Sequence, residues 1–315
     1  MNARPLQFRH GSCESLGQRR RQEDYSAVWA PTDSGSADAT KPVLVVLADG
    51  MGGHVSGHAA SRLACESYIA SFTGSSEEIG PKMARALDVA NQKLADAIVE
   101  DPQLKGMGCT LVGAYLDENG LRWVSVGDST LLLYRNGSLH RLNADHSHGA
   151  ILDRQAAAGI ISREAAINDT RRRALYSALT GGPIQMRDLE LNPHALYPGD
   201  WVIVASDGLL TLEGNDIASF LARNKNEDPV SVTRRLIQEV DGRNKPRQDN
   251  TTVVAVKIVG DKIAAGHEAV KEIIPENLDD DEPTEPTRVG PSRSRRSRLD
   301  NVVNYFKAAW SKKLA

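Results

Sequence analysis

The 315-residue chain has few of the residue types that mark secreted or membrane-spanning proteins. It contains only three cysteines, Cys13, Cys65 and Cys109. Their odd number and wide spacing predict free thiols in a reducing compartment and argue against a disulfide framework. No run approaches the roughly eighteen apolar residues of a membrane span, and residues 1–10 lack the apolar core of a signal peptide. We therefore expect a cytoplasmic protein.

An excess of charge of either sign is also missing. Lys and Arg total 38, and Asp and Glu total 41, so the formal net charge is −3. Proteins that bind nucleic acid usually carry a basic excess or a basic groove. The part of the chain before residue 260 has no long Lys/Arg tract, so we expect no nucleic-acid partner.

Patterned segments extend from about residue 8 to residue 259 and predict one domain over residues 1–260. Runs rich in Val, Ile, Leu or Trp predict strands at 43–48, 110–116, 122–126, 131–135, 201–205 and 252–259. Apolar residues at helical spacing predict helices at 59–72, 82–99, 151–158 and 230–240. Asn119-Gly120 and Asn136-Gly137 are typical of turns between antiparallel strands. Hairpins combined with a few long helices favour an antiparallel α+β domain over a doubly wound parallel sheet.

Charge is segregated in the remaining segment. Residues 276–285 contain six acids and residues 288–298 contain five arginines, which is typical of a disordered linker, here placed at 261–298. Beyond it, 299–315 carries an apolar stripe at helical spacing: Leu299, Val302, Val303, Phe306, Trp310 and Leu314. Such an amphipathic helix after arginines resembles an anchor for anionic lipid at the inner face of the membrane. The alternatives are that it folds back on the domain or docks on a partner.

Acidic residues beside Gly, Asn or a second acid occur at four separate places. These are Gln22-Glu23-Asp24, Asp49-Gly50, Ser206-Asp207-Gly208 and Asp249-Asn250. An Asp that directly follows an apolar strand lies where the strand leaves the core, with its carboxylate at the rim. Several such carboxylates on one rim would form a site of hard oxygen ligands, which Mg²⁺ and Mn²⁺ prefer. A single Asp-Gly is usually only a turn, so the argument depends on the whole set.

In this order, the set resembles the metal-dependent type 2C protein serine/threonine phosphatases, bacterial members in particular. The resemblance covers about residues 8–259 and rests on Arg19 with Gln22-Glu23-Asp24, 48–54, Gly108-Cys109-Thr110, Gly127-Asp128-Ser129, Asp145-His146-Ser147, 205–210 and 249–251. It implies a four-layer sandwich of two central antiparallel sheets flanked by helices. It also implies hydrolysis of phosphoserine and phosphothreonine in proteins by water activated at two Mn²⁺ or Mg²⁺ ions, with a third ion as an option.

The resemblance also implies roles for particular residues. Asp49 corresponds to the carboxylate that bridges both metals, and Glu23 and the carbonyl of Gly50 correspond to ligands of one of them. Asp207 and Asp249 correspond to ligands of the other metal.

The remaining roles are looser. Asp24 resembles a holder of coordinated water, or acts only through hydrogen bonds. Asp128 resembles a third-metal ligand shared with Asp207, or caps a turn. Arg19 resembles the phosphate-binding arginine, since a guanidinium can contact two phosphate oxygens at once.

Some positions depart from the family pattern. Met51 stands where many eukaryotic relatives have a histidine proposed as general acid, and Thr130 and Ser177 stand where arginines are common. The segment 145–180 resembles the flap beside the active site of bacterial members, or is a surface hairpin without substrate contact.

Three functional alternatives follow. The leading hypothesis is an active phosphatase that acts on phosphoproteins and opposes a bacterial-type serine/threonine kinase. The second is a catalytically silent scaffold that binds phosphorylated partners, although such a scaffold would be expected to lose Asp49, Asp207 or Asp249. The third, a two-metal nuclease, lacks the basic groove that a polyanion needs.

Overall fold

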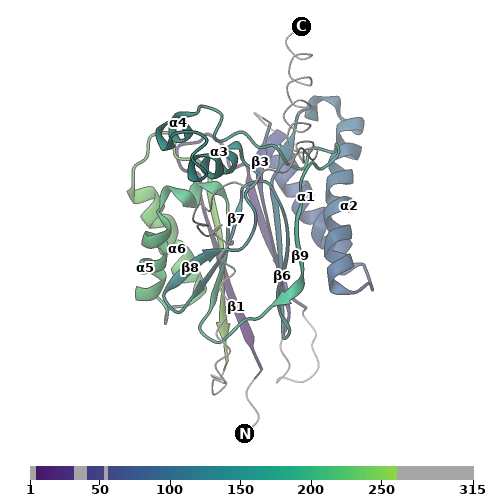
Figure 1. The fold of residues 1–315 in the computed structure, drawn as a ribbon. Coiled ribbons are helices and arrows are strands. Elements are labelled where there is room, and N and C mark those ends of the chain that lie inside the picture. The colour runs from purple at the N-terminus through teal and green to yellow at the C-terminus, as the bar shows by residue number, and fades with distance from the viewer. Residues whose placement is uncertain (1–4, 32–40, 53–55, 261–315) are drawn as a thin grey trace, which may run out of the picture. The chain divides into compact units, whose positions relative to one another are not determined.

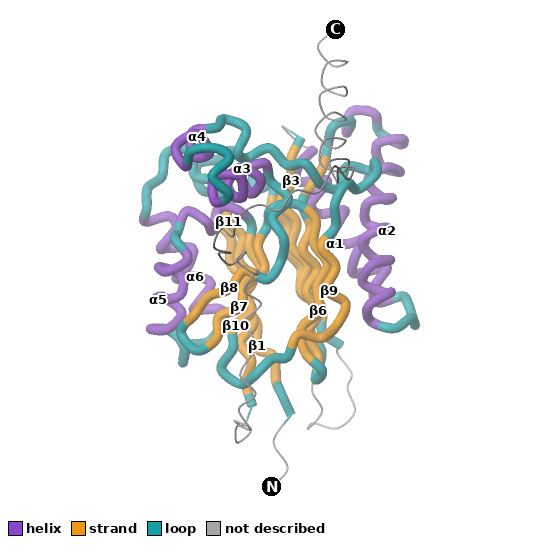
Figure 2. The backbone as a smooth tube through the Cα atoms, viewed as in Figure 1, coloured by secondary structure: helices purple, strands orange, loops and turns teal. Residues whose placement is uncertain are grey.

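Two antiparallel sheets form the centre of the described structure, and helices cover the outer face of each (Figures 1 and 2). The computed structural model describes residues 5–31, 41–52 and 56–260. The expected linker 261–298 and amphipathic helix 299–315 lie outside the described residues.

The two sheets have simple neighbour orders. The five-stranded sheet runs β1 (Gln7–Ser15), β11 (Thr251–Val259), β10 (Trp201–Ala205), β7 (Thr130–Arg135) and β8 (Ser138–Arg141). The six-stranded sheet runs β2 (Asp24–Trp29), β3 (Val43–Met51), β5 (Leu111–Asp117), β6 (Gly120–Val126) and β9 (Asp188–His194), and β4 (Gly108–Cys109) pairs with the end of β3.

Helices complete the outer layers. The six-stranded sheet packs on α1 (Ser56–Thr73) and α2 (Ile79–Glu100), and the five-stranded sheet packs on α5 (Gly214–Arg223) and α6 (Pro229–Gly242). The short helices α3 (His148–Ala157) and α4 (Arg163–Asn168) lie at one end of the sheets (Figure 1). Single 3₁₀ turns, η1 (Pro102–Leu104) and η2 (Asp207–Thr211), follow α2 and β10. Among the described helices, none has the length and apolar character needed to cross a membrane.

Alternation along the strands explains why four layers form. In β3, Val43, Val45 and Leu47 pack between the two sheets, whereas Leu44 and Val46 pack against the helices. Since successive side chains of a strand point to opposite faces, a strand buried on both faces is apolar throughout. The run 43–48 has that composition, and all six side chains are at most 2% exposed.

The predicted fold class is confirmed, and so are the six predicted strands and four predicted helices, apart from shifts of a few residues at their ends. Both predicted hairpin turns occur, between β5 and β6 and between β7 and β8. The prediction missed β1, β2, β4, β8 and β9, as well as α4 and α5. Four of the missed strands, β1, β8, β2 and β9, are the edges of the two sheets. An edge strand is partly exposed and does not need a continuous apolar run, as the burial of β1 shows.

Candidate metal centre

Five aspartates from different parts of the sequence meet at one end of the sandwich. Asp49 lies near the end of β3 and is directly opposite Asp24 at the start of β2. Asp207 follows β10, Asp249 precedes β11, and Asp128 lies between β6 and β7. The negative charges of the other four all act on Asp49. The structure therefore brings together carboxylates that the sequence analysis selected separately.

Glycine is required where Glu23 and Gly50 approach α1. A Cβ atom on Gly50 would lie 2.1 Å from the carbonyl oxygen of Gly57 and 2.5 Å from that of Glu23. A Cβ on Gly57 would in turn lie 2.9 Å from the carboxyl carbon of Glu23. The N–H of Gly50 donates to the Glu23 carbonyl at 3.0 Å, and the Ser61 hydroxyl donates to the same oxygen at 2.6 Å. These contacts place Glu23 and the backbone of Gly50 beside the first turn of α1.

Burial makes ionisation of this cluster unfavourable. It raises the pKa of Asp49 well above its ordinary value, and the neighbouring charges, that of Asp24 first, raise it further. Burial also raises the pKa of Asp24 to about 7, although a hydrogen bond from Ser206 opposes the shift. It raises the pKa of Asp128 to about 7 and that of Asp207 above its usual range. A bound cation would therefore stabilise the charged forms of these carboxylates.

Two buried oxygens support a fit to divalent cations. Oδ1 of Asp24 and Oδ1 of Asp207 have no hydrogen-bond partner among the described residues. A buried acceptor without a partner is costly, and carboxylate oxygens suit Mg²⁺ or Mn²⁺. Within 5–31, 41–52 and 56–260, however, no three Asp, Glu, His or Cys side chains are grouped so that they could hold an ion as they stand. Asp24 accepts a hydrogen bond from Ser206 at 2.7 Å. This hydrogen bond would have to break if the same oxygen of Asp24 bound an ion.

Arg19 lies beside the cluster. Its Nη2 donates to Oδ2 of Asp249 at 2.5 Å, and 48% of the arginine side chain is exposed. The rest of its guanidinium has no hydrogen-bond partner among the described residues, so it is free to contact an anion. The neighbouring loop is fixed by Asn250, whose Oδ1 accepts from the N–H of Glu23 at 2.9 Å and whose Nδ2 donates to the carbonyl of Leu16 at 3.0 Å.

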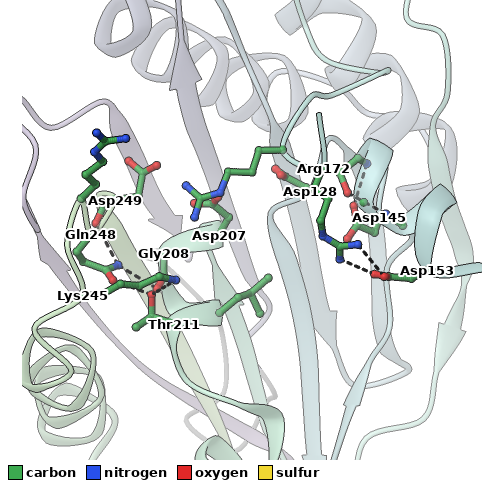
Figure 3. A pocket seen from close by; sticks show the side chains of 16 residues that line it. Asp128, Asp145, Asp153, Arg172, Asp207, Gly208, Thr211, Lys245, Gln248 and Asp249 are labelled. Atoms are coloured by element: carbon green, nitrogen blue, oxygen red, sulfur yellow. Dashed lines mark hydrogen bonds and ion pairs between the residues drawn. The ribbon is translucent and has the colours of Figure 1, made fainter. Parts of the chain in front are cut away.

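A pocket of about 330 Å³ opens next to these groups (Figure 3). Asp128 and Asp207 lie between its two sides. The 3₁₀ turn η2 and the loop before β11 form one side, and the segment 145–173 forms the other. The predicted flap therefore does line the pocket, although this does not test a substrate contact.

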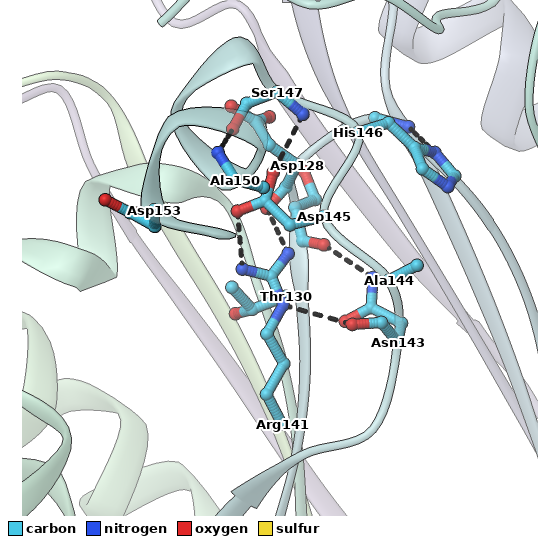
Figure 4. Close-up of polar contacts among 12 residues, drawn as sticks. Asp128, Thr130, Arg141, Asn143, Ala144, Asp145, His146, Ser147, Ala150 and Asp153 are labelled. Carbon is cyan, nitrogen blue, oxygen red and sulfur yellow. Dashed lines mark hydrogen bonds and ion pairs between the residues drawn. The ribbon is translucent and has the colours of Figure 1, made fainter. Parts of the chain in front are cut away.

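Arg141 joins the turn at Asp128 to the start of this flap (Figure 4). Its Nη2 donates to the carbonyl of Asp128 at 2.9 Å, and its Nη1 donates to Oδ2 of Asp145 at 3.1 Å. Oδ1 of Asp145 accepts the N–H of Ser147, which is the N-cap of α3. The N–H of Gly127 also donates to Nδ1 of His146 at 3.1 Å. Arg141 is thus a positioning residue, because it contacts the backbone of Asp128 and not the pocket.

The sequence analysis missed this arginine and the hydroxyl of Ser206. Arg141 belongs to an edge strand that the apolar pattern did not reveal, and its partner Asp145 was noted only as part of a motif. No pattern in the sequence singles out Arg141, because its contact with the carbonyl of Asp128 forms only in the folded chain. Thr130 is buried and donates to the carbonyl of Ala205 at 3.4 Å.

Comparison with known proteins agrees with this arrangement. The family model described as protein phosphatase 2C matches residues 31–248. The serine/threonine phosphatase stp of Listeria welshimeri is 28% identical over 250 residues, which cover 76% of this chain and 91% of that protein. The serine/threonine protein phosphatase PstP of Mycobacterium tuberculosis is 31% identical over 221 residues, which cover 69% of this chain and 40% of PstP.

Solved structures are also similar. The crystal structure of Mycobacterium tuberculosis PstP/Ppp has a TM-score of 0.63 at 27% identity and covers 80% of this chain and 99% of that chain. The catalytic domain of PstP in complex with two manganese ions has a TM-score of 0.61 at 27% identity, with 81% and 99% covered.

The fold and the acidic end of its sandwich define the class of metal-dependent protein phosphatases. The chain belongs to the protein phosphatase 2C family, because the family model matches more than half of it. The resemblance inferred from the sequence is confirmed. The individual ligand roles of Glu23, Asp24, Asp49, Gly50, Asp128, Asp207 and Asp249, and the phosphate role of Arg19, stay predictions.

The first prediction concerns the buried charge of Asp24. A carboxyl group whose folded-state pKa is raised destabilises the fold increasingly as pH rises from its unfolded pKa to its folded pKa. In EDTA, the free energy of unfolding of the Asp24→Asn full chain, relative to that of wild type, should therefore increase as the pH is raised from 5.5 to 8. The expected gain in the free energy of unfolding is on the order of 1 to 2 kcal/mol, measured by urea unfolding.

Asp228→Asn is the matched control. A hydrogen bond from Ser231 lowers the pKa of Asp228, so its carboxylate is charged at both pH values and its effect should be the same at both. An Asp24→Asn effect that is equally independent of pH would contradict a raised pKa at Asp24.

The second prediction concerns Arg141. Arg141→Met should raise the Mn²⁺ concentration for half-maximal binding by about tenfold, as is typical when a partner outside the ligand set is lost, because the turn that carries Asp128 loses its support. Calorimetric titration of the full chain with Mn²⁺ measures this.

Arg122→Met is the control, since Arg122 forms a similar ion pair with Asp117 at 3.0 Å, at the hairpin between β5 and β6. The melting temperature should fall by about the same amount in both variants. Equal Mn²⁺ affinities in the two would rule out a positioning role for Arg141.

Proposed function

We propose that this chain hydrolyses phosphoserine and phosphothreonine in proteins with the help of two Mn²⁺ or Mg²⁺ ions. The observation that carries the proposal is the convergence of five aspartates on one end of the sandwich. The pKa values of Asp24, Asp49, Asp128 and Asp207 are raised, and two buried carboxylate oxygens have no hydrogen-bond partner among the described residues. The family of the chain supports it, as does the two-manganese complex of PstP, which has the same fold.

The proposal assigns the ions to particular residues. Glu23, Asp49 and the carbonyl of Gly50 would hold one ion, and Asp49, Asp207 and Asp249 would hold the other. Asp24 would orient water, and Asp128 with Asp207 would form a third site. When bound, such a pair of ions lowers the pKa of water and offsets charge on a phosphoryl group.

The protein's own contribution is to fix these groups before the substrate arrives. Asp49 is held at a strand end where its N–H donates to the hydroxyl of Thr110 at 2.9 Å, and the N–H of Thr110 donates back to the Asp49 carbonyl at 2.9 Å. The Thr110 hydroxyl is 2.7 Å from that of Ser129, beside Asp128. Groups held in place in this way need little reorganisation during the reaction.

Arg19 would orient the phosphate. One of its nitrogens is bound to Asp249, which aims the guanidinium at the rim of the cluster. A planar guanidinium can donate to two phosphate oxygens at once.

The partners proposed are phosphoproteins and a bacterial-type serine/threonine kinase whose products this chain would dephosphorylate. The kinase is inferred from the substrate chemistry, because a protein phosphatase needs a source of phosphorylated side chains.

The third prediction tests activity. The full chain should release phosphate from a phosphothreonine peptide with Mn²⁺ and not in EDTA. Asp49→Asn and Asp207→Asn should each lower kcat/KM by more than about a hundredfold, because a lost ligand costs more than the ten- to hundredfold cost of a lost partner around the ligands. Asp216→Asn, at an exposed carboxylate paired with Arg243, should keep its activity.

Turnover that persists in EDTA would exclude the metal mechanism. A chain that binds Mn²⁺ and the phosphopeptide but releases no phosphate would instead be the silent scaffold.

The fourth prediction tests the proposed contact of 299–315 with the inner face of the membrane, which rests on the sequence pattern alone. The full chain should sediment with vesicles rich in anionic lipid, more than with neutral vesicles, and be released by high salt. The Phe306→Ser/Trp310→Ser variant should stay in the supernatant because the apolar stripe is interrupted. Equal sedimentation of wild type and variant would remove the membrane proposal.

A further inference from the structure

Cations on one side of the pocket have no carboxylate to pair with. Of the five acids that line it, Asp145 pairs with Arg141, Asp153 with Arg172 and Asp249 with Arg19, whereas Asp128 and Asp207 form no ion pair among the described residues. Lys245 and Arg247 on this side, and Arg173 on the flap, also line the pocket, and no carboxylate of the described residues lies within ion-pair distance of any of the three.

The loop that carries Lys245 and Arg247 is firmly held. It runs from the end of α6 at Gly242 to the start of β11 at Thr251. Gln248 is 4% exposed, and its Nε2 donates to the carbonyl of Gly208 at 3.2 Å and to the hydroxyl of Thr251 at 3.2 Å. Its Oε1 accepts from Thr211 at 2.7 Å. The loop is therefore fixed to η2, the 3₁₀ turn that begins with Asp207.

The backbone of the loop is strained where Arg247 enters the pocket. Arg247 has φ 62° and Asn244 has φ 47°, a region that an arginine seldom adopts. The N–H of Gln248 donates to the carbonyl of Lys245 at 3.1 Å and closes the turn. Strain of this kind persists only where surrounding contacts determine the conformation, and here Gln248 provides them.

Lys245 lies close to the proposed metal cluster. Its Nζ is 3.4 Å from Oγ1 of Thr211, in the 3₁₀ turn that begins with Asp207. Burial and Asp249 act most strongly on the pKa of Asp207, and the charge of Lys245 acts on it after those of Arg173 and Arg19. Figure 3 shows Lys245, Gln248 and Asp249 on one side of the pocket, beside Asp207. In an extended peptide, side chains two residues apart lie roughly 7 Å from each other on the same face. A peptide with its phosphoryl group at Asp207 could thus place a neighbouring side chain near Lys245.

We propose that Lys245 and Arg247 form a second anion subsite, which selects substrates that carry a further anionic side chain within two residues of the phosphorylated one. The anionic group is a carboxylate of Asp or Glu or the phosphate of a second phosphorylated residue, because both accept hydrogen bonds from ammonium and guanidinium groups. This inference rests on the proposed phosphatase function and adds a substrate class to it.

The fifth prediction compares three phosphothreonine peptides at one ionic strength. One has neutral residues around the phosphothreonine, one has glutamate two positions away, and one has phosphoserine there. The wild-type full chain with Mn²⁺ should show a kcat/KM about fivefold higher for each anionic peptide, as expected from one or two exposed ion pairs. High salt should reduce this preference.

Lys245→Gln/Arg247→Gln should lower the ratio of kcat/KM for each anionic peptide to kcat/KM for the neutral peptide from about five to about one. Lys245→Glu should reverse the preference. Arg223→Gln/Lys225→Gln is the matched control, because it removes the same charge from residues that do not line this pocket. Thermal unfolding of each variant verifies folding.

The outcomes separate the two proposals. Turnover of the neutral peptide without any preference in wild type, or a preference that survives in the double variant, would overturn the subsite and leave the phosphatase function standing. Absence of turnover with every peptide would overturn the phosphatase function, and the subsite with it. A preference confined to the doubly phosphorylated peptide would identify phosphate as the anion.

Discussion

The burial of several carboxylates close to one another is the constraint on which the rest of this structure depends. Asp24, Asp49, Asp128 and Asp207 all have raised pKa values, in each case first because of burial. A chain could avoid the cost of burying these charges by turning the side chains outward, but each is held at a strand end or in a tight turn. The stability of the fold and the binding of cations are therefore linked at the same atoms.

The sandwich supplies the rigidity that this arrangement needs. Each sheet is buried on both faces, and the strands that end near the cluster belong to the most buried part of the molecule. Two glycines, Gly50 and Gly57, let the end of β3 and the start of α1 approach so closely that no side chain fits between them. On the other side, the loop before β11 is attached to η2 through Gln248. The pocket thus has a fixed acidic end, a fixed cationic side and a flap that Arg141 joins to the acidic end at Asp128.

The central strands and most of the acidic cluster could be predicted from the sequence, and for the same physical reason. A strand buried on both faces must be apolar, and an Asp that ends such a run stands out, as at Asp49 and Asp207. Edge strands such as β1 and β8 carry polar residues and give no such signal. Arg141 on β8 was missed with its strand, and the pairing of Arg19 with Asp249 depends on two loops 230 residues apart. Lys245 and Arg247 were not selected from the sequence, because only the folded loop shows that they line a pocket.

The most direct test of this account is the number of protons released when Mn²⁺ binds to the full chain, measured by calorimetry at pH 6.5 in buffers with different ionisation enthalpies. If Asp24 and Asp128 have pKa values of about 7 and cations stabilise the charged carboxylates, binding should release about one proton or more per chain at pH 6.5, and fewer protons at pH 8.5. Binding of Mn²⁺ with no proton release at pH 6.5, or no binding at all, would contradict it.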